Sequence, residues 1–298
     1  MSFSSDVKTE LCKLNVSDKC CAVAECYGVL MYGNTFSNSL IKIITESRPF
    51  AKRLTKLFKT AFGFSVHPQE SASGSGKLIF TVTEKDKLDR IFDTYGYDRD
   101  TALAHHINFG VLEDDCCRKS FVRGAFFAGG SVTNPEKRYH LELVTDHYNV
   151  SREACTILLE LGFTPKTTDR NGHYIIYFKQ SDVIEDLLTT IGAPVAAMSV
   201  MNAKITKNMY NTVNRKVNCD TANVSKTVDA AMLQIDAIKK LRASGKLMEL
   251  PQKLRETAEL RTEYPELSLR ELAELTDPPV TKSCLNHRLR KLVELSGE

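Results

Sequence analysis

Hydrophobic positions change their spacing along the chain in a regular order. Two apolar helical stretches, 21–33 and 120–132, each precede two strands, a helix, two more strands and a final helix. Alternating or β-branched runs such as 139–145 indicate the strands, and apolar positions three and four residues apart indicate the helices. Corresponding elements lie 96 to 99 residues apart. The pattern therefore predicts an internal duplication, αββαββα, with halves at about 20–100 and 115–195.

Small residues gather on one side of the two apolar helical stretches. Gly124, Ala128 and Gly129 have this placement in the second stretch, and Ala24 and Gly28 have it in the first. Residues three and four positions apart share one face of a helix. A face with almost no side chains lets a second helix come very close. We therefore expect the two stretches to pack on each other at the centre of the duplicated domain.

Turn signals divide the strands. Asn-Gly at 171–172 predicts a two-residue hairpin turn. The composition also predicts a turn at 34–37, a short strand at 64–66 and a flexible hairpin loop at 71–76.

The composition changes near residue 195. Residues 196–220 are predicted to form a basic linker, and its first part, 196–216, contains no acidic residue. Two interpretations fit equally well. One is a solvated helix, and the other is a helix that contacts DNA phosphates, a role that Lys, Arg and Asn all serve. Under the second interpretation, the phosphate contacts are Lys204, Lys207, Arg215 and Lys216.

The pattern of residues 221–298 is helical throughout. Ser268 and Glu271 have the spacing of a capping box, which marks the start of a helix. The sequence Asp-Pro-Pro-Val at 277–280 then breaks the chain, and a last helix follows. This order of helix, short turn and helix predicts a helix-turn-helix at about 268–296.

The last helix has an apolar and a polar face. Leu285, Leu289 and Leu292 form the apolar face, and no acidic residue occurs from Val280 through Val293. The polar side chains are of the kinds that contact base edges and phosphates. The predicted DNA contacts are Thr281, Lys282, Ser283, Asn286, His287, Arg288, Arg290 and Lys291. The alternative is a basic surface helix in a helical protein-binding domain.

Composition narrows the class of protein. The chain has 298 residues, of which 42% are hydrophobic and 26% charged, and its net charge of +3 does not by itself indicate a nucleic-acid partner. No apolar run reaches the ~18 residues of a membrane helix. The N-terminal residues lack the features of a secretory signal. We therefore expect a cytoplasmic protein without a membrane partner.

The nine cysteines are expected to stay reduced, because their number is odd and no export signal precedes them. Two groups of candidate metal ligands occur: Cys20, Cys21 and Cys26, and Cys116 and Cys117 with His105 and His106 nearby. Neither group has the two-residue spacing of a zinc knuckle, and adjacent cysteines on a helix point in different directions. The sequence therefore predicts structural thiols, no metal and no cofactor.

Four segments carry a resemblance to known families. Glu25–Gly33 and Phe121–Gly130 resemble the paired motifs of the LAGLIDADG homing endonucleases. Together with Asn214–Cys219 and Asp277–Lys291, they resemble the bacterial WhiA family in particular. The resemblance implies an α+β domain at residues 1–195, in which two helices cross and each group of strands lies along a DNA groove. An all-α helix-turn-helix domain at 221–298 would follow it.

The same resemblance implies a role. It suggests a nucleoid-associated regulator of transcription that binds double-stranded DNA, with other transcription or cell-division factors as further partners. Members of the family act in cell division, chromosome segregation and, in spore-forming relatives, sporulation.

Active LAGLIDADG enzymes place an acidic residue just before the final glycine of each motif, where it binds a divalent metal. The matching positions here are Tyr32 and Gly129, and neither supplies a carboxylate. Glu25 lies about 10 Å along a helix from Tyr32, and the acids at 113–115 lie roughly 20 Å from Gly129. The resemblance therefore implies a protein without catalytic activity.

Two other functions stay open. A metal-dependent homing-type endonuclease would cleave DNA when magnesium is present, and a protein-interaction scaffold would use the helical tail to bind another factor. The duplicated domain also has two interpretations at Lys137 and Arg138, which are either phosphate contacts or part of a solvated hairpin.

Overall fold

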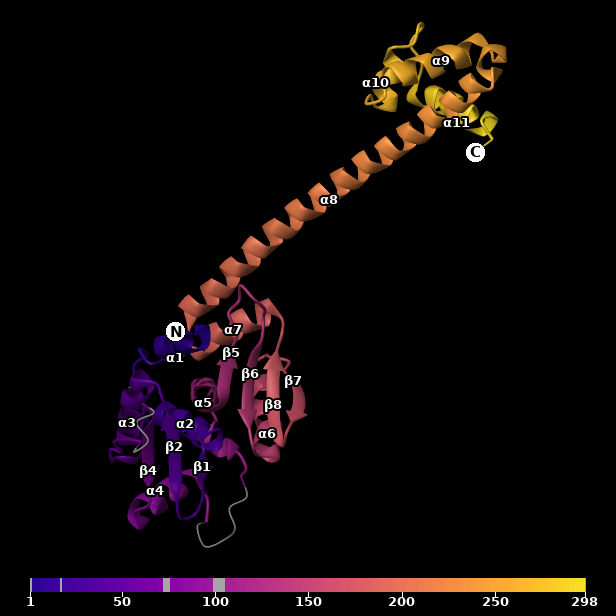
Figure 1. Cartoon of the computed structure of the whole chain (residues 1–298). Coiled ribbons are helices and arrows are strands. Elements are labelled where there is room, and N and C mark those ends of the chain that lie inside the picture. The colour runs from indigo at the N-terminus through magenta and orange to yellow at the C-terminus, as the bar shows by residue number, and fades with distance from the viewer. Residues whose placement is uncertain (1, 17, 72–75, 99–104, 298) are drawn as a thin grey trace. The chain divides into compact units, whose positions relative to one another are not determined.

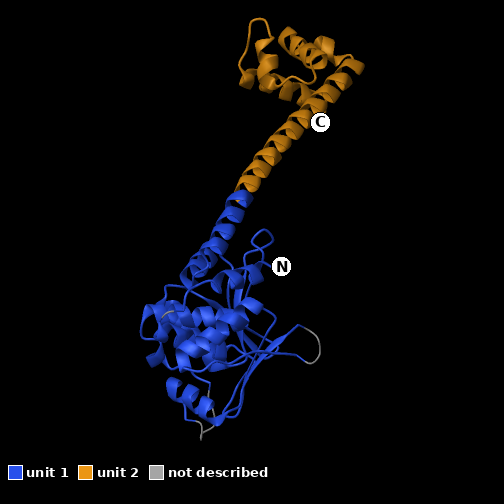
Figure 2. Ribbon diagram, turned by 90° about the vertical axis from the view of Figure 1, so that its left-hand side faces the viewer, with its two compact units in different colours: residues 1–207 blue, residues 208–298 orange. Residues whose placement is uncertain are grey.

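The chain forms two compact units in the computed structural model, Met1–Lys207 and Asn208–Glu298 (Figure 1, Figure 2). The structure describes residues 2–16, 18–71, 76–98 and 105–297. Within these ranges, no helix is both long and apolar enough to cross a lipid bilayer. The predicted fold class, an α+β domain followed by an all-α domain, is confirmed.

Unit 1 begins with helix α1 (Phe3–Leu11) and then repeats one order of elements twice. The first copy consists of α2 (Lys19–Met31), β1 (Thr35–Phe36), β2 (Ile41–Thr45), α3 (Arg48–Phe62), β3 (Gln69–Glu70), β4 (Leu78–Val82) and α4 (Lys85–Tyr95). A short 3₁₀ helix, η1 (Phe109–Val111), precedes the second copy. The second copy consists of α5 (Asp115–Gly129), β5 (Gly130–Val132), β6 (Leu141–Thr145), α6 (Tyr148–Glu160), β7 (Lys166–Arg170), β8 (His173–Phe178) and α7 (Ser181–Ile191). The predicted αββαββα duplication is therefore confirmed.

Each copy contains one four-stranded antiparallel sheet, with the strand orders β1-β2-β4-β3 and β5-β6-β8-β7. The central strands share one register, since Ile41 is opposite Val82 in the first sheet and Leu141 is opposite Phe178 in the second. All four side chains are buried. Because alternate residues of a strand point to the same side, one face of each sheet packs into the core and the other faces outward.

Helices α2 and α5 are in contact at the centre of unit 1 (Figure 1). A Cβ atom added at Gly28 would lie 2.1 Å from the carbonyl oxygen of Phe121, and one at Gly124 would lie 2.0 Å from that of Glu25. These contacts are reciprocal, because both pairs of equivalent residues are 96 positions apart. The two backbones therefore touch at the pseudo-two-fold axis of the duplication, as the small residues predicted.

Some local predictions need correction. The expected turn at 34–37 contains strand β1. Residues 64–66 form no strand, because this segment packs on α3 and its last carbonyl oxygen accepts a hydrogen bond from Thr55 Oγ1 (2.9 Å). The hairpin loop expected at 71–76 falls mostly outside the described residues. The hairpin turn at 171–172 is confirmed, with φ of 52° and 81°.

Helix α8 (Pro194–Ala243) belongs to both units. The sequence predicted a basic linker at 196–220, with a solvated helix as one of its interpretations, and helical structure from 221 onward. The structure has one continuous helix of 50 residues here, and no glycine or internal proline interrupts it. At its start, the Glu10 carboxylate accepts hydrogen bonds from the backbone N–H groups of Val195 (2.7 Å) and Ala196 (2.9 Å). These are donors that the first turn of a helix leaves without a partner.

Unit 2 packs the last part of α8 on a 3₁₀ helix and three short α-helices. They are η2 (Lys246–Glu249), α9 (Gln252–Glu263), α10 (Leu269–Glu274) and α11 (Lys282–Leu295). The core consists of buried residues from each of them: Ile238, Leu241, Leu247, Leu254, Ala258, Leu272, Ala273, Leu285, Leu289 and Leu292. Burying each leucine stabilises the unit by about 2 kcal/mol before the entropy of ordering is subtracted.

Candidate nucleic-acid interface

The first helix of the helix-turn-helix, α10, starts at the predicted capping box. Ser268 Oγ accepts a hydrogen bond from the backbone N–H of Glu271 (3.4 Å), and the Glu271 carboxylate accepts one from the backbone N–H of Ser268 (2.8 Å). Hydrogen bonds that the Glu271 carboxylate accepts from the Ser268 side chain and backbone lower the pKa of Glu271. Because a helix start leaves its first N–H groups without partners, this box gives the six-residue helix a defined beginning.

The turn between α10 and α11 is held by Thr276, whose side chain is buried. Its hydroxyl donates a hydrogen bond to the carbonyl oxygen of Ala273 (2.9 Å) and accepts one from the backbone N–H of Val280 (3.0 Å). The N–H of Val280 also donates to the carbonyl oxygen of Ala273 (3.1 Å). This turn fixes where α11 leaves α10.

Thr281 caps the start of helix α11, and its hydroxyl accepts a hydrogen bond from the backbone N–H of Cys284 (3.3 Å). Leu285, Leu289 and Leu292 are buried, as predicted. Six of the predicted DNA contacts are exposed: Thr281, Lys282, Ser283, His287, Arg290 and Lys291. The other two, Asn286 and Arg288, are half-buried. The predicted face is therefore accessible along most of the helix.

Cationic side chains from three helices line one hollow of unit 2. They are Lys226 of α8, Arg270 of α10 and Lys282 of α11. The hollow lined by these three residues is termed the basic hollow. The sequence indicated only Lys282, because Lys226 and Arg270 join it through the fold and belong to no common motif.

A fourth cation, Arg261, lies at the inner side of the basic hollow. Its side chain is buried and donates hydrogen bonds to Gln234 Oε1 (3.0 Å) and to the carbonyl oxygen of Leu267 (2.7 Å). Both acceptors are neutral, and burial lowers the pKa of Arg261. Helix α11 also begins at this hollow, with the partial positive charge of its N-terminal end. The hollow therefore favours an anion.

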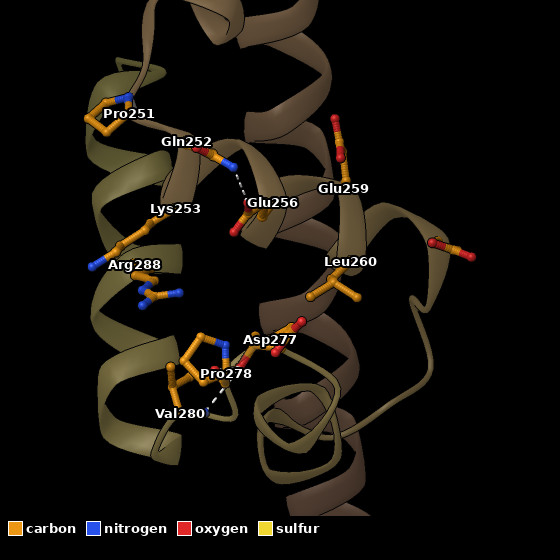
Figure 3. A pocket seen from close by; sticks show the side chains of 12 residues that line it. Pro251, Gln252, Lys253, Glu256, Glu259, Leu260, Asp277, Pro278, Val280 and Arg288 are labelled. Atoms are coloured by element: carbon orange, nitrogen blue, oxygen red, sulfur yellow. Dashed lines mark hydrogen bonds between the residues drawn. The ribbon is translucent and has the colours of Figure 1, made fainter.

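A second hollow of unit 2 carries mainly acidic side chains (Figure 3). Its charged lining residues are Lys253, Glu256, Glu259, Glu263, Asp277 and Arg288. Arg288 reaches it from α11 (Figure 3). Arg288 and Lys282 are six residues apart, which places them on different sides of the helix. This acidic hollow repels phosphates, so the charge of unit 2 favours DNA on the side of Lys282.

The two predicted phosphate contacts at the start of α8 are engaged within unit 1. Lys204 forms an ion pair with Asp182. The Lys207 ammonium donates a hydrogen bond to the carbonyl oxygen of Pro135 (2.7 Å) and lies 4.4 Å from the ring centroid of Tyr139. These contacts hold α8 on the second copy of the duplication.

The remaining predicted phosphate contacts lie in two different places. Arg215 and Lys216 are exposed on α8, in unit 2. Lys137 and Arg138 are exposed in the turn between β5 and β6, in unit 1, where the backbone N–H of Lys137 donates to the carbonyl oxygen of Asn134 (3.0 Å). Within unit 2, neither Arg215 nor Lys216 lines the basic hollow.

The ends of α2 and α5 define the positions of the catalytic carboxylates in LAGLIDADG enzymes. The helix contacts at Gly28 and Gly124 set an offset of 96 residues between the copies. Gly129 therefore corresponds to Gly33 and not, as the sequence suggested, to Tyr32. Aligning the two motifs by their final glycines gave an offset one residue larger than this. The contacts between the two helices correct it.

These positions do not fit a divalent metal. A Cβ atom at Gly129 would lie 2.3 Å from the carbonyl oxygen of Val144 and 2.9 Å from Tyr32 Cδ1, so the backbone leaves no room for a carboxylate side chain. Tyr32 is buried, and its hydroxyl has no hydrogen-bond partner among the described residues. Burial raises the pKa of Tyr32. A neutral phenol is a poor ligand for a hard cation.

Glu25 is the acidic residue of the first motif that lies nearest to the C-terminal end of α2, but its carboxylate is engaged in other contacts. Its carboxylate is buried and accepts hydrogen bonds from Arg53 Nε (2.5 Å) and Nη2 (2.8 Å) and from Arg123 Nη1 (2.9 Å). Two guanidinium groups therefore compensate it, and it contributes to the core between the copies.

Comparisons with known proteins agree with this architecture. The WhiA LAGLIDADG-like domain matches residues 118–210, and the WhiA C-terminal HTH domain matches residues 213–296. A "Probable cell division protein WhiA" of Ruminiclostridium cellulolyticum is 39% identical over 306 residues, which cover 99% of this chain and 97% of that protein. A protein of the same name from Clostridium botulinum is 38% identical over 310 residues, with 100% and 98% covered.

Solved structures share the fold. Full-length DUF199/WhiA from Thermatoga maritima matches with a TM-score of 0.60 and 23% identity, and covers 100% of this chain and 98% of that one. The N-terminal LAGLIDADG domain of DUF199/WhiA matches with a TM-score of 0.51 and 20% identity, and covers 64% and 90%. The helix-turn-helix indicates a DNA-binding protein. Since relatives more than 30% identical cover nearly all of it, the chain belongs to the WhiA family.

Proposed function

We propose that this protein regulates transcription by binding double-stranded DNA through α11 and the basic hollow, without cutting the DNA. The observation that carries the proposal is the distribution of charge in unit 2. Exposed donors on α11 adjoin the cations Lys226, Arg270 and Lys282, whereas the acidic side chains line the other hollow. Such a face attracts the phosphate backbone and orients the recognition helix.

The two groups of residues have different tasks in this proposal. The basic hollow binds DNA phosphates, because its cations and the start of α11 line it together. Ser283, Asn286, His287 and Arg290 contact base edges in the major groove, with Thr281 and Lys291 at phosphates nearby. Arg288 contributes less, since it borders the acidic hollow.

Unit 1 has a different role in the proposal. Gly33 and Gly129 cannot hold the metal that cleavage would require, which supports a non-catalytic protein. The outward face of its second sheet also carries an acid, Glu142, which accepts hydrogen bonds from Ser131 Oγ (3.0 Å) and lies beside His140 Nε2 (3.1 Å). We therefore propose that unit 1 mainly provides a surface for protein partners. Its contacts with DNA are made through Lys137 and Arg138.

The cellular role follows from the relatives. Proteins 38–39% identical to this chain are named for cell division. We propose that this protein acts at the nucleoid on genes of cell division and chromosome segregation and, in a spore-forming organism, of sporulation.

A salt titration tests the DNA-binding face. The full chain is titrated onto a random-sequence duplex at several salt concentrations, and the slope of log K against log[salt] is measured. Because each lost phosphate contact lowers the magnitude of this slope by about 0.9, we expect Lys226→Ala and Lys282→Ala each to reduce it by about that amount. Lys253→Ala removes the same charge beside the acidic hollow and should leave the slope unchanged.

Further measurements separate the alternatives. On a fragment recovered from bound genomic DNA, Arg290→Ala should weaken binding by about 1–3 kcal/mol if it contacts a base. Cleavage of plasmid DNA with magnesium would support an endonuclease instead. A chain whose DNA affinity is weak and independent of salt would support a protein-binding scaffold. Equal slopes for Lys226→Ala, Lys282→Ala and Lys253→Ala would refute the proposed face.

A further inference from the structure

Four cysteines of unit 1 form one cluster. Cys20, Cys21, Cys116 and Cys117 place their sulfur atoms within 4.8 Å of one another. The sequence had suggested two separate pairs whose thiols diverge. That expectation is wrong, because α2 and α5 start side by side and each contributes two sulfurs to the same point.

The spacing suits a single tetrahedral ion. Zinc–thiolate bonds of about 2.3 Å place four sulfurs about 3.8 Å apart. The adjacent sulfurs of Cys116 and Cys117 are 4.0 Å apart, and every pair lies within 4.8 Å, so each sulfur needs to move by well under 1 Å. A disulfide bond is about 2.05 Å long, so the 4.0 Å pair is not bonded. An iron–sulfur cluster attaches its thiolates to different iron atoms and requires wider spacing.

Groups that can offset the negative charge of metal-bound thiolates lie beside the cluster. Helices α2 and α5 begin at Lys19 and Asp115, and neither has a side-chain cap, so the partial positive charge of both helix starts lies beside the cluster. Ser120 is buried and hydrogen-bonds to the sulfur of Cys21. Lys119 lines the hollow beside Cys21 and Cys116.

The four thiols differ in their exposure to solvent. Cys20 and Cys116 are exposed, whereas Cys117 is buried. An ion can therefore enter from solvent and finish in a partly closed site.

We propose that these four cysteines bind one Zn²⁺ and that the ion joins the two copies of the duplicated domain. Binding exchanges four S–H protons for four Zn–S bonds, and the protons go to solvent. The complex carries two negative charges, which Lys119 and the starts of α2 and α5 offset. Thiolate ligands select zinc over magnesium or calcium.

This site differs from the metal site of LAGLIDADG enzymes. The enzymes bind metal at the C-terminal ends of the two central helices, whereas the cysteines occupy their N-terminal ends. Along a helix such as α5, of 15 residues, the two ends are about 20 Å apart. A zinc ion here has a structural role, and the proposal does not depend on DNA binding.

Metal analysis of the full chain tests the proposal. The reduced protein is exposed to Zn²⁺, dialysed and measured by plasma mass spectrometry, and we expect about one zinc per chain. Replacing the two exposed ligands together, Cys20→Ser with Cys116→Ser, should lower this to less than about 0.1. The matched control replaces two exposed thiols of unit 2, Cys219→Ser with Cys284→Ser, and should keep the zinc.

A second measurement, on unmodified protein, tests the site even if the Cys20→Ser, Cys116→Ser variant misfolds. Unmodified protein loaded with Co²⁺ should show the intense thiolate-to-metal absorption of a tetrahedral site, and zinc should displace it. The proposal is overturned if the unmodified protein retains no zinc, if both double variants retain it equally, or if peptide mapping of fresh protein finds disulfides between the two pairs.

Discussion

Replacing Gly124 by alanine perturbs the point where α2 and α5 touch. A Cβ atom there would lie 2.0 Å from the carbonyl oxygen of Glu25 and 3.0 Å from the backbone nitrogen of Val29. Both neighbours are backbone atoms of a buried helix and cannot rotate away. An ordinary contact of this kind is at least 3.4 Å, so the helices must separate by about 1.4 Å.

The expected change in the free energy of unfolding combines two losses and one gain. Overpacking a close-packed core costs about 1–3 kcal/mol, and more when the backbone must move. A separation of this size also removes a large part of the dispersion energy along the helix contact. Alanine is a better helix former than glycine and returns about 1 kcal/mol. We therefore expect Gly124→Ala to destabilise unit 1 by about 3 kcal/mol.

Thermal unfolding with hydrogen exchange measures this effect. For a unit of this size, a loss of 3 kcal/mol lowers Tm by about 6–12 °C. Amide exchange should accelerate in α2 and α5 and stay unchanged in α9 and α11, which serve as an internal control. Asn223→Ala, at an exposed position of α8, raises helix propensity without a new contact and should not lower Tm. A Gly124→Ala protein within 2 °C of the unmodified one would refute a backbone contact between the helices.

Two other predictions concern charges of unit 1. Glu25→Gln leaves Arg53 and Arg123 without a compensating carboxylate in the core and should cost about 3–5 kcal/mol in urea unfolding; a loss below 1 kcal/mol would contradict this. Burial and the stacked ring of His105 (3.7 Å between centroids) lower the pKa of His147. The unfolded chain therefore binds a proton more readily, so the stability of unit 1 should fall as pH drops below about 6.5. His147→Gln should flatten the dependence of Tm on pH, and an unchanged slope would argue against this assignment.

Helices whose ends are marked by neighbouring capping residues or glycines could be predicted from the sequence. Helix α3 (Arg48–Phe62) has both end signals in the sequence, because Ser47 caps its first turn and Gly63 ends it at a φ of 78°, which favours glycine. The capping box at Ser268 and the three leucines of α11 were also evident, since each lies within a few residues of its partners. Strands β1 and β3 were missed because each has only two residues, too few for an alternating pattern.

Sites built from distant segments could not be predicted in the same way. Lys226 and Arg270 are 44 residues apart in sequence and meet Lys282 only because α8 and α10 pack beside α11. Nothing in the local sequence of Lys226 distinguishes it from other lysines of α8. Likewise, the contacts that engage Lys204 and Lys207 come from Asp182 and Pro135, which lie in the duplicated domain.

The duplication itself explains why the thiol cluster was overlooked. A residue on the face of α2 that points to the pseudo-two-fold axis meets residues around its own counterpart on α5, which lies 96 positions later. Gly28 meets α5 as Gly124 meets α2, and a pair of cysteines becomes a set of four. Judged copy by copy, each cysteine pair has the wrong spacing for zinc, and only the symmetry completes the ligand set. The same offset of 96 residues makes Gly33 and Gly129 counterparts at the C-terminal end of these helices. The axis therefore offers two sites where a metal could join the copies, and this chain has glycines at one of them and four thiols at the other.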